Sequence, residues 1–158
     1  MRETDTHLFF YNDDTVFSNW YPVRFQYRGI YFSNSEQAFM YEKALFFGDF
    51  KTLGEITLTR DPKEVKALGR KVKNFEPNIW SEVSLGFMIM VNLAKYCQNP
   101  IEEEKLLKTG NKVLVEASPY DKIWGVGLHW SDDKILDENN WLGKNLLGKS
   151  LMHIRGVL

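Results

Sequence analysis

Glu36 and Lys43 are the two residues of this 158-residue chain whose types and spacing best fit chemistry. Seven residues of α-helix turn through about 700°, so both side chains would leave a helix from nearly the same face. A carboxylate and an amine in one cleft can divide a reaction between them. The acid moves a proton, and the amine, when neutral, attacks an electrophilic carbon. Cleavage of a sugar–nitrogen bond is one reaction that uses both groups.

Two alternatives to paired catalysis by Glu36 and Lys43 remain. Ser33 precedes Glu36 by three residues, which is the spacing of a capping box, and Lys43 would then be a solvated lysine. In the second alternative, the Glu36 carboxylate acts alone by stabilising a positively charged sugar centre. Spacing by itself does not choose between these possibilities.

Two loops combine polar side chains with aromatic rings. One is Phe17–Pro22, and the other is Asp121–Gly127, which contains a carboxylate, the indole of Trp124 and two glycines. Such loops can line a pocket, stack a base and bring backbone donors to a phosphate. For the second loop, an ordinary turn around a packed tryptophan is the alternative. Aromatic residues make up 15% of the chain, which favours some stacking surfaces, although aromatic core packing explains any single ring equally well.

A phosphate-loop pattern occurs near the C-terminus, but its context argues against that function. Residues 143–150 read Gly-Lys-Asn-Leu-Leu-Gly-Lys-Ser. A phosphate loop must follow a buried strand and open a helix, whereas residues 137–141 are Asp-Glu-Asn-Asn-Trp and only eight residues follow Ser150. We predict that Gly143 and Gly148 are close-packing points in or beside the last helix.

Net charge and composition limit the classes of ligand and partner that the protein is expected to bind. Twenty Lys and Arg against 21 Asp and Glu give a net charge of −1, so the chain lacks the basic field with which duplex-binding domains neutralise phosphates. Recognition of a single nucleotide in a pocket remains compatible with this balance. The three histidines lack metal-ligand spacing among themselves or with Cys97. We therefore expect no metal and no cofactor.

The location of the protein is expected to be cytoplasmic. The longest apolar stretch, Val83–Ala94, is too short to span a membrane, so we expect no membrane partner. The N-terminus carries acidic and polar residues where a signal peptide has an apolar run. Cys97 is the single cysteine and cannot form an internal disulfide, which fits a reducing compartment.

Short strands and several helices are the elements expected to position these groups. Periodicity, caps and breakers predict strands at 8–11, 23–28 and 113–115, and helices at 34–47, 62–70, from about 80 through 94, at 102–108 and at 141–155, with an exposed loop at 131–140. The predicted fold class is α+β: a compact, mainly helical single domain over residues 1–158, with one small sheet built from the N-terminal strands and Val113–Val115.

An ordered series of motifs along nearly the whole chain resembles the YbiA/NADAR family. The matching segments are Phe17-Ser-Asn-Trp20, Ser35-Glu-Gln-Ala-Phe39, Lys43, Trp80, Leu106–Gly110, Leu114–Asp121, Trp124–Gly127 and Asn145–Arg155. Gln37 departs from the pattern, because family members typically have histidine there. Glutamine cannot exchange protons near neutrality.

The resemblance implies a YbiA-like fold and an N-glycosidase that acts on N-linked ribose. Two substrates fit: ADP-ribose on guanine bases of DNA or RNA, which we favour, and phosphoribosylamino-pyrimidines of riboflavin synthesis. A non-catalytic module that binds ADP-ribose or an NAD-type ligand is the alternative of another class. The expected partner is therefore an ADP-ribose-like or ribosyl-base substrate.

The resemblance also implies roles for individual residues. Glu36 is implied to be catalytic, with Lys43 as its covalent partner, and we expect Asp121 to join them. The expected substrate-binding residues are Phe17, Ser18, Asn19, Trp80, Trp124, Gly125 and Asn145. We expect these residues to gather in one pocket.

Overall fold

Residues 1–158 are all described by the computed structural model, and they form two compact units. The helical unit comprises Pro22–Asn99, and the sheet unit comprises Met1–Tyr21 together with Pro100–Leu158. The helical unit is thus an insertion within the sequence of the sheet unit. No helix in either unit is both long enough and apolar enough to cross a membrane.

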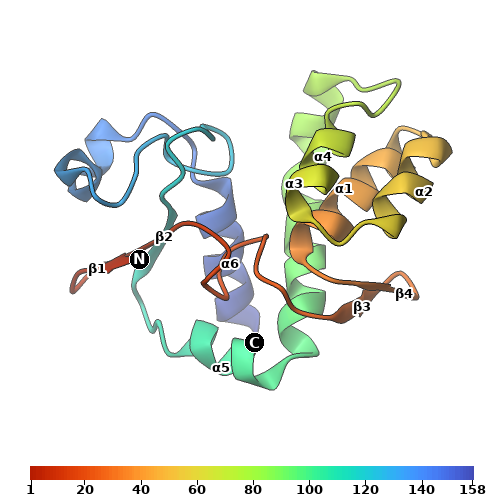
Figure 1. Cartoon of the computed structure of the whole chain (residues 1–158). Helices are drawn as coiled ribbons and strands as arrows, with labels where there is room; N and C mark the ends of the chain where they lie inside the picture. Colours follow the sequence, from red (N-terminus) through yellow and green to blue (C-terminus); the bar gives the residue numbers. More distant parts are fainter. The chain divides into compact units, whose positions relative to one another are not determined.

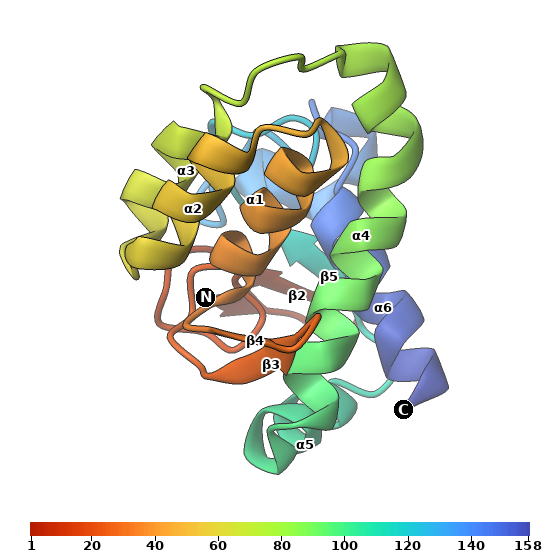
Figure 2. The ribbon, with the colours of Figure 1, turned by 90° about the vertical axis from the view of Figure 1, so that its right-hand side faces the viewer.

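The helical unit is organised around the helix that carries Glu36 and Lys43. Its elements are β3 (Phe25–Tyr27), β4 (Ile30–Phe32), α1 (Ser35–Phe46), α2 (Phe50–Leu58), α3 (Pro62–Gly69) and α4 (Pro77–Cys97). Helix α1 contacts α2, α3 and α4 and lies between α4 and the α2–α3 pair (Figures 1 and 2). A hydrogen bond of 2.8 Å from the Ser35 hydroxyl to Asn92 Oδ1 joins the first turn of α1 to α4.

The start of α1 differs from the predicted capping box. Asn34 is the N-cap, and its Oδ1 accepts a hydrogen bond from the Gln37 amide at 2.9 Å. The Gln37 side chain reaches back in turn and accepts from the Ser33 amide at 2.9 Å. The predicted Ser33–Glu36 pair is therefore wrong by one residue, because asparagine at the extended position takes the capping role. Glu36 is buried in the first turn without serving as the partner of Ser33.

Strands β3 and β4 form a separate two-stranded hairpin. The two turn residues, Arg28 and Gly29, have φ of 51° and 77°, which is the left-handed geometry of a type I′ turn. Tyr27 donates to the buried Glu42 carboxylate, and Arg28 pairs with it, which ties the hairpin to α1. The prediction that this strand joins the N-terminal sheet was wrong, because its partner is the next segment along the chain.

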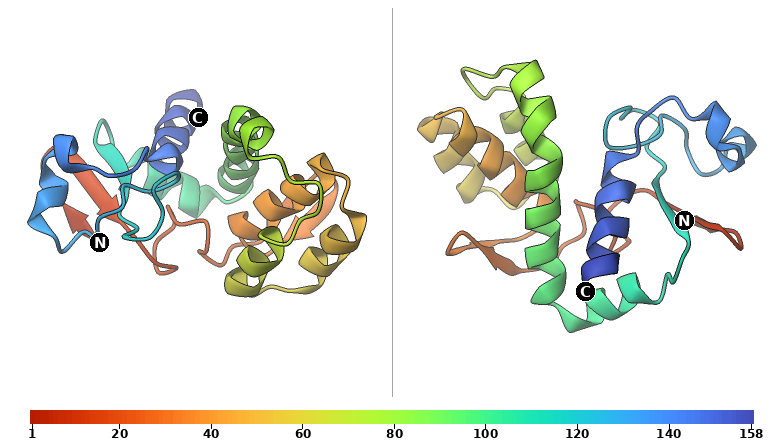
Figure 3. Two further views of the ribbon diagram at one scale, coloured as in Figure 1. Left: turned by 90° about the horizontal axis from the view of Figure 1, so that it is seen from above. Right: turned by 180° about the vertical axis from the view of Figure 1, so that it is seen from behind.

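The sheet unit contains the two ends of the chain. Its elements are β1 (Arg2–Glu3), β2 (His7–Phe10), α5 (Pro100–Leu107), β5 (Val113–Glu116), two 3₁₀ turns (Asp133–Leu136 and Glu138–Asn140) and α6 (Leu146–Val157). The strand order is β1-β2-β5, with β2 parallel to β5. The predicted pairing of the first apolar strand with Val113–Val115 is confirmed. Helix α5 lies beside the C-terminal end of α6 (Figure 3).

Residues 131–140 are more than the exposed loop that was predicted. Ile135 is fully buried and packs with Phe9, Val115 and Val126. The Trp141 indole donates to the Ile135 carbonyl at 2.8 Å and packs against the same cluster. The acidic residues around Ile135 are exposed. The polar composition of residues 131–140 therefore does not reveal that Ile135 is buried in the core.

Helix α6 begins five residues later than predicted, at Leu146. Asn145 precedes it with φ 53°, and residues 138–140 form a 3₁₀ turn rather than a strand. A Cβ on Gly143 would lie 2.2 Å from the Gly125 carbonyl oxygen, and one on Gly148 would lie 2.0 Å from the Leu114 carbonyl oxygen. Both glycines are therefore close-packing points, and the phosphate-loop pattern is coincidental.

Candidate active site

The Lys43 amine is held at the edge of the helical unit by contacts on two sides. Its Nζ donates a 2.8 Å hydrogen bond to the Gly69 carbonyl oxygen, near the end of α3. It also lies 4.2 Å from the centroid of the Phe75 ring, in the segment that follows α3. The side chain is partly buried, so the amine has a defined position while remaining accessible.

Burial and two charged neighbours determine the pKa of this amine. Burial lowers the pKa of Lys43, the negative charge of Glu36 raises it, and the positive charge of Arg70 lowers it. The net effect on the pKa is downward. Lys43 consequently carries a larger neutral fraction near neutral pH than an ordinary lysine, and a nucleophilic amine needs that form. Glu36 and Lys43 thus interact electrostatically along one face of α1.

The close approach of α1 and α3 creates this geometry. Gly69 faces Met40, and a Cβ at position 69 would lie 2.1 Å from the Met40 sulfur. Glycine therefore lets the end of α3 come near enough to α1 for its carbonyl group to reach Lys43.

The segment after α3 is fixed by Asp49, the N-cap of α2. The Asp49 carboxylate accepts hydrogen bonds from the Lys73 amide at 2.9 Å and from the Thr52 hydroxyl at 2.7 Å and amide at 3.1 Å. These bonds lower the pKa of Asp49 to about 2. The carboxylate therefore joins the start of α2 to the segment that carries Phe75.

Gln37 has a structural role at the start of α1. Besides the bond from Ser33, its Nε2 donates to the Ile56 carbonyl at 3.0 Å and to the Thr59 carbonyl at 2.7 Å. Both of these acceptors belong to the end of α2, and Gln37 is 3% exposed. All three hydrogen bonds join the side chain to backbone groups, as expected for a residue that positions the helix.

Trp80 is packed inside an aromatic cluster of the helical unit. Its ring centroid lies 5.3 Å from that of Phe39 and 5.9 Å from that of Phe87, which is stacked on it. Phe46 and Phe47 complete the contacts, and Phe47 also touches Phe75. Trp80 therefore supports the surface around Lys43, and its direct contact with substrate stays a prediction.

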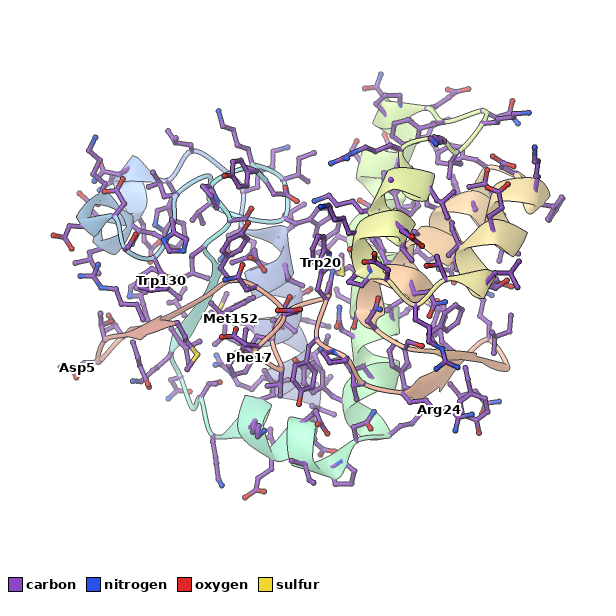
Figure 4. The ribbon with its side chains drawn as sticks, viewed as in Figure 1. Asp5, Phe17, Trp20, Arg24, Trp130 and Met152 are labelled. Atoms are coloured by element: carbon purple, nitrogen blue, oxygen red, sulfur yellow. The ribbon has the colours of Figure 1, made fainter.

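The Phe17–Asn19 motif lies in the sheet unit, on the loop after β2 (Figure 4). Phe17 lines a cavity of about 410 Å³ with residues of β2 and α5, and its ring packs on Phe10 with centroids 5.5 Å apart. Ser18 and Asn19 are buried, and the Ser18 hydroxyl accepts from the Trp20 amide. This cavity contains no other candidate site residue, and the roles of Phe17, Ser18 and Asn19 in substrate binding stay predictions.

The Asp121–Gly127 loop is a tightly bonded turn. Asp121 Oδ1 accepts from the Ile123 amide at 2.9 Å and from the Trp124 amide at 2.8 Å. A Cβ on Gly125 would lie 2.8 Å from the Asp121 carbonyl oxygen, so only glycine fits there. One carboxylate oxygen of Asp121 thus has a structural role, and its catalytic role stays a prediction, as do the substrate contacts of Trp124 and Gly125.

Asn145 joins this loop to the sheet. Its Nδ2 donates to the Leu114 carbonyl at 2.9 Å, its Oδ1 accepts from the Glu116 amide at 3.0 Å, and its backbone amide donates to the Gly125 carbonyl at 3.1 Å. The structure therefore brings Asp121, Trp124, Gly125 and Asn145 together in the sheet unit. Substrate binding by Asn145 stays a prediction, as does the single pocket for all candidate residues.

Three residues around Lys43 were not indicated by any sequence pattern, namely Gly69, Arg70 and Phe75. The Asp61-Pro62 signal correctly predicted α3, with Asp61 accepting from the Lys63 amide at 2.9 Å. It did not indicate that the end of α3 packs against α1. No group of three or more His, Cys, Asp or Glu residues is placed to hold a metal ion.

Comparison with known proteins places the chain in a family. The sequence model of the NADAR domain matches residues 9–158. N-glycosidase R617 of Acanthamoeba polyphaga mimivirus is 43% identical, with 97% of this chain and 96% of that protein covered. N-glycosidase Npun_R5314 of Nostoc punctiforme is 32% identical, with 88% and 82% covered. The riboflavin biosynthesis protein VVA0006 of Vibrio vulnificus is 25% identical over 96% of this chain but only 38% of its own length.

A solved structure agrees with this placement. The NMR structure of the E. coli protein YbiA is similar with a TM-score of 0.79 and 28% identity, covering 99% of this chain and 86% of that one. The predicted mainly helical α+β fold with a small sheet is therefore confirmed. Because the family model matches nearly the whole sequence and these relatives align along most of it, the chain belongs to the NADAR domain family.

Proposed function

We propose that this protein is an N-glycosidase that removes ADP-ribose from ADP-ribosylated guanine bases in nucleic acid. The observation that carries the proposal is the Lys43 amine, whose pKa is lowered and whose position is fixed beside Glu36 on α1. The names of two relatives, both N-glycosidases, support the reaction class.

The reaction uses the two groups in sequence. Neutral Lys43 attacks C1′ of the ribose and passes one of its protons to the Glu36 carboxylate, which gives that proton to the leaving nitrogen as the bond from C1′ to this nitrogen breaks. Opening of the ribose ring yields a Schiff base between Lys43 and C1′. Water then adds to C1′, the sugar ring closes again, and the amine is released. One water molecule is consumed for each ribose–nitrogen bond that is broken.

The surroundings of Lys43 suit this role. A hydrogen bond to the Gly69 carbonyl uses an N–H of the amine, so the lone pair of the neutral form is left for attack. Partial burial favours the neutral amine, and the nearby Glu36 supplies the proton transfer. A solvated lysine would have neither a fixed direction nor a lowered pKa.

The guanine substrate is tested by direct incubation. An oligonucleotide that carries ADP-ribose on one guanine is mixed with the native protein and with the Glu36→Gln variant, and released ADP-ribose is measured by chromatography. The proposal expects release by the native protein and loss of at least 100-fold in rate for the variant, which is the usual scale of a general-acid contribution. No release by the native protein would overturn the guanine assignment.

The second candidate substrate is a phosphoribosylamino-pyrimidine of riboflavin synthesis, which the relative from Vibrio vulnificus favours. Both substrates contain a ribose–nitrogen bond, so the same residues serve either. A competition experiment with both substrates decides between them through the ratio of kcat/KM values. Tight binding without turnover of either, unchanged by Glu36→Gln, would instead identify a binding module.

A further inference from the structure

A short segment with three exposed cations touches Lys43 at both of its ends. The segment is Gly69–Phe75, whose first residue accepts the hydrogen bond from the amine and whose last residue places its ring 4.2 Å away. Between them, Arg70, Lys71 and Lys73 are all exposed. The chain as a whole has a net charge of −1, so this concentration of positive charge beside the site is local.

None of these three cations has an acidic partner. The salt bridges of the protein involve Arg2, His7, Arg28, Lys108 and Lys112. No hydrogen bond is made by the side chains of Arg70, Lys71 or Lys73. The positive charge of Arg70 therefore acts near Lys43 without compensation by an acid of its own, and its guanidinium group can bind an anion.

The position of the segment is set before any ligand arrives. Asp49 holds the Lys73 amide, Val72 is buried, and Asn74 turns the chain with φ 61°. The backbone that carries the cations is thus anchored at its middle as well as at its ends. A pre-organised binding segment loses little conformational freedom when it binds.

We infer that Arg70 recognises a phosphate or diphosphate group attached to the ribose whose C1′ is attacked by Lys43. This inference rests on the proposed function, and it assigns Arg70 as the residue that recognises the phosphate present in both candidate substrates. The planar guanidinium group can donate two parallel hydrogen bonds to phosphate oxygens. Lys71 and Lys73 add positive potential around the same anion without fixing its orientation.

The test measures binding of ADP-ribose, the product of the proposed reaction, by calorimetry. Three variants are compared with the native protein: Arg70→Gln, Arg70→Lys and the control Lys63→Gln. Lys63 is an exposed lysine in the first turn of the same helix. We expect Arg70→Gln to weaken binding about tenfold or more, because a charge-assisted hydrogen bond contributes about 1.5–3 kcal/mol. The affinity of Arg70→Lys for ADP-ribose should lie between those of the native protein and Arg70→Gln. The affinity of Lys63→Gln should stay within about twofold of the native value.

An uncharged ligand separates phosphate recognition from a general loss of binding. Adenosine should bind native protein and Arg70→Gln equally weakly, and inorganic pyrophosphate should compete with ADP-ribose in the native protein only. Equal ADP-ribose affinity of the native protein and Arg70→Gln would overturn the inference, as would failure of the native protein to bind both ADP-ribose and pyrophosphate. Binding that depends on Arg70 in a protein that releases no ADP-ribose from guanine would instead contradict the proposed function alone.

Discussion

Lys43 Nζ and the Gly69 carbonyl oxygen are joined by a 2.8 Å hydrogen bond that connects α1 to the end of α3. This bond gives the amine a direction, and the Phe75 ring limits its movement on another side. A lysine on the same face of α1 as Glu36 is thereby distinguished from a solvated side chain. The reactivity of the amine should therefore depend on Glu36 and on the contacts that hold α1 and α3 together.

Removal of the Glu36 charge should lower the pKa of Lys43 further. Glu36 raises that pKa against the larger effect of burial, so Glu36→Gln leaves burial and Arg70 to act alone. The pH at which the amine becomes half reactive toward a lysine-labelling reagent, followed by mass spectrometry, should move down. Glu55→Gln, an exposed acid on α2, should leave this midpoint in place. An unchanged midpoint in Glu36→Gln would mean that the two groups do not interact.

Gln37→His should keep the pH profile of the native protein. Gln37 makes three hydrogen bonds to backbone groups, and a neutral imidazole can make two, so we expect a loss of about 1 kcal/mol in stability. Gln37→Ala removes all three and should lower kcat more than it changes KM, because the first turn of α1 loses its position. Measurements of kcat and KM from pH 5 to pH 9 check both variants. A new titration near pH 6.5 in Gln37→His would show that position 37 exchanges protons.

Alanine at position 69 should destabilise the protein, whereas alanine at position 86 should not. A Cβ at 69 would overlap the Met40 side chain, with an expected cost of about 1–3 kcal/mol. A Cβ at 86, in the exposed middle of α4, would meet no atom within 4 Å and should stabilise by about 0.4–1 kcal/mol. Urea unfolding of the two variants gives the comparison. Equal effects of both substitutions would contradict the close packing of α1 and α3.

Much of the helix pattern was predictable, because caps and prolines are local signals. Asp61-Pro62 predicted α3 and Asn99-Pro100 predicted α5, and both helices begin at the proline. Helix α2 was missed because it is only nine residues long and contains weak helix formers, namely Gly54, Thr52 and Thr57.

The site was predictable only in part, for a similar reason. The spacing of Glu36 and Lys43 fixes their shared face, since helical geometry is local. Contacts from Gly69, Arg70 and Phe75 depend on how α3 packs against α1, which no spacing within α1 encodes. The C-terminal helix was predicted to start at Trp141, but Trp141 packs against the core of the sheet unit and the helix starts at Leu146.

Asp49→Asn should lower stability at neutral pH but not in strong acid. The pKa of Asp49 in the folded protein is about 2, below its ordinary value of 3.8, mainly because its carboxylate accepts the Lys73 and Thr52 hydrogen bonds. A depressed pKa means that the ionised form stabilises the fold above pH 3.8 and that this contribution is lost as pH falls through about 2.

The measurement compares free energies of unfolding for the native protein, Asp49→Asn and the control Asp5→Asn between pH 2 and pH 7. The difference between the native protein and Asp49→Asn should be constant above about pH 4 and shrink toward pH 2. The exposed Asp5 should show a much smaller difference throughout. A difference for Asp49→Asn that does not depend on pH would contradict the assigned role of the ionised carboxylate.

Borohydride trapping of a sugar–protein adduct during turnover tests the role of Lys43 most directly. Reduction of the proposed Schiff base would leave a stable bond between C1′ of the sugar and the Lys43 nitrogen, which peptide mass spectrometry can locate. We expect a trapped adduct on Lys43 in the native protein and none in Lys43→Ala, with Lys66→Ala on α3 trapped like the native protein. An adduct that persists in Lys43→Ala, or that maps to another residue, would contradict Lys43 as the nucleophile.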